Sequence, residues 1–112
     1  MEGPIYTYLL VRTDIPLADQ LVQAAHAALE AGRQFEQPEE PCHMAVLAVK
    51  SEEALMQAVA HAESKGVRMA VFYEPDPAEE GAGPMGYTAA ASEPIQGDLR
   101  KTFKKWGLWK PV

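Results

Sequence analysis

Four polar side chains recur at spacings of four, three and four residues along a predicted helix that follows residue 16. Asp19, Gln23, His26 and Glu30 therefore share one face of that helix. A histidine in such a stripe is a candidate acid or base, because its imidazole exchanges protons near neutral pH. The alternative is a solvated helical face in which His26, beside the apolar side, is a partly buried, hydrogen-bonded histidine.

A second polar group lies just before this helix, where the first predicted strand, residues 5–11, ends. Arg12, Thr13 and Asp14 follow that uncharged strand directly, and Pro16 suits the first turn of a helix because its missing N–H would be unpaired there anyway. We expect Thr13 or Asp14 to cap the free N–H groups of the helix. The helix thus begins near the carboxyl end of a strand, where α/β proteins usually bind ligands.

The same helix carries an apolar face, which we expect to pack on the sheet. Its alanines would let the helix axis approach the sheet closely, and larger aliphatic side chains widen the face. The residues of this predicted core-facing side are Leu17, Leu21, Val22, Ala24, Ala25, Ala28 and Leu29.

Three more strands and a second helix are predicted farther along the chain. The strands are residues 44–49, 67–73 and 87–92. Ser51 would cap the second helix and Gly66 would end it. The buried stripe of that helix would be formed by Leu55, Val59 and Ala62.

Two successive strand–helix–strand units predict right-handed crossovers and parallel pairing of the first three strands. The fourth strand follows residues 74–86, an acidic, proline-rich loop without a helical pattern, so we expect it to run antiparallel. This loop should leave the sheet at the same edge as Arg12 and Asp14. The predicted fold is α/β: a single domain over residues 1–112, built as a three-layer αβα sandwich with a four-stranded, mixed, mostly parallel sheet flanked by helices.

The charge of the chain is uneven. A formal net charge of −6 argues against indiscriminate binding of nucleic acids. Half of the basic residues nevertheless lie in the last thirteen positions, where Lys101, Lys104 and Lys105 are interleaved with aromatic residues. This segment either contacts RNA through phosphates and stacked bases, or docks its aromatic rings on the sheet while the lysines stay solvated.

Composition narrows the functional class further. No apolar run approaches the roughly 20 residues of a membrane helix, and the first residues do not resemble a signal peptide, so we expect a cytosolic protein without membrane contact. The single cysteine, Cys42, is expected to be inert. Neither a phosphate-binding glycine loop nor a metal-ligand spacing is found, which predicts neither cofactor nor metal.

Two segments together resemble a known family. V-R-T-D at the end of the first strand, followed by Q-A-A-H-A-A in the helix, is similar to the first motif of the type 2 peptidyl-tRNA hydrolases, which places Arg12, Asp14, Gln23 and His26 at motif positions. The spacing of Pro84, Thr88 and Pro94 resembles the second motif of that family. The resemblance covers nearly the whole chain and is closest to a divergent branch.

The resemblance implies an enzyme that cleaves the ester between a peptidyl or N-blocked aminoacyl group and tRNA. A carboxylate, Asp76 in one alignment register and Glu74 in the other, would orient water. His26 and Gln23 would polarise or position the ester, and Thr88 would donate a hydrogen bond. Substrate-binding roles would fall to Arg12, which holds phosphate or pairs with Asp14, and to Lys101, Lys104 and Lys105.

One departure from the family pattern supports a different class of function. The family motif has a lysine four residues before the glutamine, and this chain has Asp19 there. An aspartate repels both a phosphate and a developing oxyanion. The alternative is therefore a catalytically inactive RNA- or protein-binding module on the same fold. Edge strands and exposed tryptophans would allow a homodimer in either case.

Overall fold

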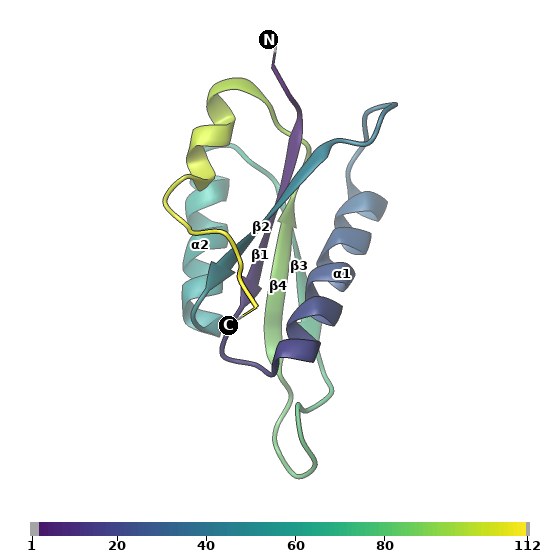
Figure 1. The fold of residues 1–112 in the computed structure, drawn as a ribbon, viewed down its shortest axis with the longest axis vertical. Coiled ribbons are helices and arrows are strands. Elements are labelled where there is room, and N and C mark those ends of the chain that lie inside the picture. The colour runs from purple at the N-terminus through teal and green to yellow at the C-terminus, as the bar shows by residue number, and fades with distance from the viewer. Residues whose placement is uncertain (1–2, 112) are drawn as a thin grey trace.

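The architecture is a four-stranded sheet between helices, as a computed structural model that describes residues 3–111 shows (Figure 1). Helix α1 covers one face of the sheet, and helix α2 with the short 3-10 helix η1 covers the other. In chain order the elements are β1 (Tyr6–Arg12), α1 (Leu17–Gln34), β2 (His43–Val49), α2 (Glu52–Ser64), β3 (Met69–Glu74), β4 (Gly86–Ser92) and η1 (Gly97–Phe103). The predicted α/β sandwich is confirmed.

The sheet has the strand order β2-β1-β4-β3. β1 and β2 are parallel, and β4 is antiparallel to both of its neighbours, as its helix-free connection predicts. The expected parallel pairing of the first three strands holds only for β1 and β2. β3 runs in the same direction as these two strands, but β4 is inserted between β1 and β3. The loop before β4 is long enough to return the chain into the sheet.

The α2 face of the core follows the sequence pattern. Leu55, Val59 and Ala62 are buried against the sheet, together with Ala58. The Ser51 side chain accepts a hydrogen bond from the backbone N–H of Ala54 at 3.0 Å, which caps the helix as predicted.

The predicted core-facing side of α1 is wrong. Leu17, Leu21, Val22 and Leu29 are 46%, 59%, 50% and 64% exposed, whereas the buried positions are Gln20, Gln23, Ala27 and Ala31. Ala24 and Ala28 of the predicted face do pack on the core, but Ala25 is exposed. The reason lies in the sheet. β4 presents alanines at its centre, Ala89 and Ala91, so a helix face of small side chains fits closely there and bulky leucines do not.

The predicted cap of α1 is also wrong. In the part of the chain that the structure describes, no side chain caps the first turn, which begins after Pro16. The Thr13 hydroxyl donates instead to the backbone oxygen of Val49 at 3.3 Å, and the Asp14 carboxylate pairs with Arg12. Thr13 is thus held by a residue far away in the sequence, and Asp14 by Arg12, two residues before it.

The segment after η1 covers the outer edge of β2. The backbone N–H of Ala48 donates to the oxygen of Gly107 at 3.0 Å, and that of Trp109 donates to the oxygen of Val46 at 2.7 Å. Trp106 and Trp109 are half-buried rather than exposed. The tryptophans and this edge of the sheet thus make contacts within the chain.

Candidate active site

Three motif residues from three elements form one chain of hydrogen bonds. The Thr88 hydroxyl on β4 donates to Oε1 of Gln23 on α1 at 2.6 Å. Nε2 of Gln23 then donates to Oε1 of Glu74, at the end of β3, at 2.9 Å. The hydroxyl and the carboxylate therefore fix both ends of the Gln23 carboxamide. Residues separated by 65 and 51 positions in the sequence meet at one point.

A bulge in the sheet explains why Thr88 points toward α1. Phe72 lies opposite Ala89 and Tyr73 lies opposite Tyr87, so the register between β3 and β4 skips Thr88. An extra residue in one strand bends the backbone locally and redirects a side chain. The regular alternation of the strand would otherwise send Thr88 toward α2, because its neighbour Ala89 faces α1.

The three side chains differ in their exposure to solvent, and this difference separates their possible roles. Thr88 is fully buried and Gln23 is 2% exposed, so neither side chain meets solvent. Glu74 is only partly buried. The two buried residues can hold the Glu74 carboxylate in position, and Glu74 is the member of the chain that a ligand could reach.

The two candidate carboxylates do not occupy equivalent places. The second oxygen of Glu74, Oε2, accepts a hydrogen bond from the backbone N–H of Asp76 at 3.2 Å. The Asp76 side chain is exposed in the loop. Glu74, and not Asp76, thus lies in the hydrogen-bond chain with Gln23.

The imidazole of His26 lies beside this chain. Its ring is stacked on Phe72, with the centroids 4.3 Å apart and an angle of 2° between the planes. Phe72 precedes Glu74 by two residues on β3, and His26 follows Gln23 by three on α1, so ring and carboxylate share one side of the site. His26 is half-buried, so part of its ring stays accessible.

Arg12 is the last residue of β1 and contacts the loop before β4. Its guanidinium donates to both oxygens of Asp14 at 2.8 and 3.0 Å, and to the backbone oxygens of Met85 and Tyr87 at 2.7 and 3.2 Å. The hydrogen bond to Asp14 raises the pKa of Arg12, burial opposes this, and the charges of Asp14 and Glu52 add to it. Of the two roles expected for Arg12, binding phosphate or pairing with Asp14, the structure shows the pairing with Asp14. Arg12 ties the loop before β4 to β1, as predicted from their common edge.

Glu52 contributes to this end of the molecule in a way that the sequence analysis missed. Its Oε2 accepts a hydrogen bond from the backbone N–H of Tyr87 at 2.8 Å. Gly86, with φ +84°, allows this approach, because a Cβ atom at that position would lie 2.5 Å from Glu52 Oε2. In the sequence, the available signal for this close contact was a glycine directly before a predicted strand. Asp19 is partly buried and lies about one turn before Gln23 on the same side of α1.

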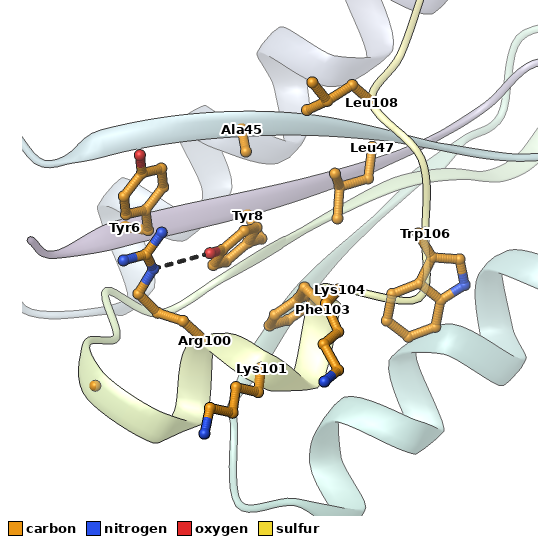
Figure 2. A pocket seen from close by; sticks show the side chains of 11 residues that line it. Tyr6, Tyr8, Ala45, Leu47, Arg100, Lys101, Phe103, Lys104, Trp106 and Leu108 are labelled. Atoms are coloured by element: carbon orange, nitrogen blue, oxygen red, sulfur yellow. Dashed lines mark hydrogen bonds between the residues drawn. The ribbon is translucent and has the colours of Figure 1, made fainter.

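The three candidate lysines lie elsewhere. Lys101, Lys104 and Lys105 are exposed on and after η1, on the sheet face opposite α1 (Figure 1). There a cavity of about 530 Å³ lies between β1, β2 and η1 (Figure 2). The Arg100 guanidinium lies 3.9 Å from the centroid of Tyr6, and its Nε donates to the Tyr8 hydroxyl at 3.1 Å. The structure does not bring these lysines to Gln23 and Glu74.

Neither a metal group nor a membrane helix is found in residues 3–111. No three His, Cys, Asp or Glu side chains in this range lie where they could bind one metal ion. None of the helices described combines the length and hydrophobicity that crossing a membrane requires.

Comparisons with known proteins agree with the arrangement of motifs. Residues 5–105 match the family model described as peptidyl-tRNA hydrolase PTH2. The fold is similar to that of a solved protein of unknown function from Agrobacterium tumefaciens strain C58, with a TM-score of 0.66 and 12% identity; the match covers 97% of this chain and 100% of that one. At that identity the likeness concerns the fold alone. No curated protein matched the chain.

Proposed function

The chain belongs to the peptidyl-tRNA hydrolase PTH2 family, and on this premise we propose that it hydrolyses the ester between a peptidyl or N-blocked aminoacyl group and tRNA. The observation that carries the proposal is the chain of hydrogen bonds from Thr88 through Gln23 to Glu74. It joins both family motifs in one place and leaves a carboxylate accessible at its end. A structural role alone would not require an accessible carboxylate there.

In the proposed reaction Glu74 is the general base. Its Oε1 is held by Gln23, and its Oε2 takes a proton from a water molecule as the water oxygen bonds to the ester carbon. The imidazole N–H of His26 donates to the oxyanion that forms. The bond between the carbon and the ribose oxygen then breaks, and the ribose oxygen takes the proton from Glu74. Thr88 acts as a positioning residue through Gln23.

The charges around this site predict weak binding of the polynucleotide. Asp19 and Glu74 face the site, and Asp76 lies in the loop beside it. The guanidinium of Arg12 already binds one carboxylate and two backbone oxygens. Phosphate groups would therefore be repelled at short range, and the family's usual substrate should bind with a high KM.

A catalytically inactive RNA-binding module is the second candidate function, and the cavity in Figure 2 favours it. Tyr6, Tyr8 and Trp106 line the cavity beside Arg100 and Lys104. Aromatic surfaces next to cations suit single-stranded nucleic acid, whose bases stack and whose phosphates are neutralised. This surface is remote from Glu74, so binding there does not require catalysis.

The first experiment measures the release of N-acetylated amino acid from acylated tRNA by the purified protein. We expect slow turnover that Glu74→Gln reduces at least 100-fold and that Asp76→Asn, the matched control in the loop, changes less than threefold. His26→Ala should reduce turnover by about 100-fold to 1,000-fold, as expected for loss of one oxyanion donor. Wild-type turnover equal to buffer, or an equal loss in Asp76→Asn, would contradict the proposal.

A second measurement separates the two candidates. Binding of a fluorescein-labelled single-stranded RNA is followed by anisotropy for the wild type, for Lys104→Glu, and for Glu74→Gln. If the chain is a binding module, Lys104→Glu weakens binding severalfold and Glu74→Gln does not, while no variant hydrolyses the ester. Turnover with no detectable binding of single-stranded RNA would exclude the module.

A further inference from the structure

The cavity beside η1 has the size and the lining of a small-molecule site. It measures about 530 Å³ and lies between β1, β2, η1 and the segment after η1; we call it the η1 cavity. Protein pockets that bind small molecules span roughly 300–1,000 Å³ and combine apolar walls with a few fixed polar groups. The walls of the η1 cavity are mostly apolar and include Leu47, Phe103, Trp106 and Leu108.

An arginine is held in a fixed orientation at one end of this cavity. Figure 2 shows Arg100 beside Tyr6 at that end and Trp106 at the opposite end. The guanidinium of Arg100 lies 3.9 Å from the centroid of the Tyr6 ring, and its Nε donates to the Tyr8 hydroxyl at 3.1 Å. Because the stacking and the hydrogen bond orient the guanidinium in the free protein, a ligand would not have to order it.

Arg100 lacks the carboxylate partner that the other arginines have. The other three each form an ion pair at 2.8–3.0 Å: Arg12 with Asp14, Arg33 with Glu30, and Arg68 with Glu93. Within residues 3–111, no carboxylate pairs with Arg100, and its terminal nitrogens donate to no acceptor. The Tyr8 hydroxyl accepts from Nε, and its own proton has no acceptor in the same range. The terminal nitrogens and this hydroxyl are therefore available to an incoming anion.

Charge and geometry indicate a ligand with one negative charge. The chain as a whole is acidic, with a formal net charge of −6, so an anion needs a local cation to bind. Lys101 pairs with Asp98 at 3.4 Å, and Figure 2 shows the ammonium groups of Lys101 and Lys104 pointing away from the strands. Arg100 is thus the cation directed toward the strands that line the cavity. A polynucleotide would bring several phosphates to this one guanidinium, whereas a single carboxylate on an apolar body matches it.

We propose that the η1 cavity binds a small aromatic monocarboxylate. The carboxylate would accept hydrogen bonds from Arg100 and from the Tyr8 hydroxyl, and the ring would lie toward Phe103 and Trp106, since aromatic rings make favourable contacts with one another. The cavity lies on the sheet face opposite α1, away from Glu74. Binding there does not depend on the proposed hydrolysis, and its test needs no measurement of activity.

Titration with 3-phenylpropionate tests the site, followed by the indole N–H signals of the two tryptophans in ¹H–¹⁵N NMR spectra. Trp106 lines the cavity, whereas Nε1 of Trp109 donates to Gln20 of α1 at 2.6 Å, so Trp109 is an internal control. We expect the Trp106 signal to shift with a Kd of about 0.1–5 mM, which is typical of a ligand of this size. The Trp109 signal should not move. Comparison with the spectrum of Trp109→Phe assigns the two signals.

The dependence on charge is measured with one variant and one neutral compound. Arg100→Gln should raise the Kd at least tenfold, because charge-assisted hydrogen bonds are lost. Lys104→Gln is the matched control: it removes one positive charge from the lining but leaves Arg100 in place, so the Kd should change less than threefold. The neutral 3-phenylpropionamide should also bind at least tenfold more weakly than the acid. Equal Kd values for the wild type and Arg100→Gln, or for the acid and the amide, would overturn the proposal.

Binding of RNA in the same cavity is the competing outcome. In the anisotropy assay with labelled single-stranded RNA, Arg100→Gln would then weaken RNA binding, while 3-phenylpropionate would shift neither tryptophan signal. That result would refute the proposal in favour of a polynucleotide. A wild type in which the signals of Trp106 and Trp109 move equally would also refute it, because the compound would then bind without preference for the η1 cavity.

Discussion

Replacing Thr88 with valine should test whether the buried hydrogen bonds at the site also stabilise the fold. Valine keeps the size and branching of the side chain but removes the hydroxyl that donates to Gln23 at 2.6 Å. Because Thr88 is fully buried and Gln23 is 2% exposed, water cannot replace the lost donor. An unsatisfied buried acceptor costs about 1–3 kcal/mol of folding free energy. For a domain of this size that lowers the Tm by about 4–12 °C.

Thermal and urea unfolding, followed by circular dichroism, measure this loss. Thr13→Val is the matched control, because the Thr13 hydroxyl also donates to an oxygen, at 3.3 Å, but from an exposed side chain. That variant should lose less than about 0.5 kcal/mol. In the double variant Thr88→Val with Gln23→Met both polar partners are gone, so the two losses should not add.

Two results would refute this reasoning. If Thr88→Val unfolds at the same temperature as Thr13→Val, the hydrogen bond contributes nothing measurable to folding. If the losses of Thr88→Val and Gln23→Met simply add, the two side chains are not coupled. In the esterase assay Thr88→Val should lower kcat more than it raises KM, since it acts on the position of Glu74 and not on substrate contacts.

Four further changes have defined outcomes. Asp19→Lys should raise kcat/KM for acylated tRNA at least tenfold and make it fall with added salt, as steady-state kinetics at 50 and 200 mM salt would show. Arg12→Lys should speed cleavage of residues 75–85 in limited proteolysis, because one ammonium cannot hold a carboxylate and two backbone oxygens in the same geometry. Trp109→Phe removes the 2.6 Å hydrogen bond to Gln20 and should lower the Tm by about 4 °C per kcal/mol lost. Burial, together with the charges of Lys105 and Lys65, lowers the pKa of His61 in the folded protein. The contribution of neutral His61 to stability is therefore complete above an imidazole's ordinary pKa and is lost as the pH falls through the lower pKa of the folded state. Between pH 7 and 5 the Tm of His61→Gln should fall less than the Tm of the wild type.

Local chemistry determined much of the fold. The strands and α2 were predictable because short runs of apolar residues, a serine cap and a terminal glycine determine the structure of residues only a few positions away in the sequence. Ser51 caps α2, and Gly66 follows its end with φ +89°, as expected. The polar stripe of α1 was also predictable from spacing, and so was the common edge of Arg12 and the loop before β4.

The sequence did not determine which of two possible partners each of these residues would contact. α1 has two faces with few charges, and only the alanines of β4 select the smaller one for the core. The choice between Glu74 and Asp76 depends on where β3 ends relative to Gln23, and the direction of Thr88 depends on a bulge between two strands.

The separation of the basic segment from Gln23 depends on the way the chain returns after β4, which places η1 on the α2 side of the sheet. Sequence records periodicity along one element, because each side chain's direction follows from the helix or strand that carries it. Contacts between elements are set by the shapes of both partners and by the order of the strands. Only the tertiary structure therefore determined which polar groups share a site and which apolar face of α1 remains outside.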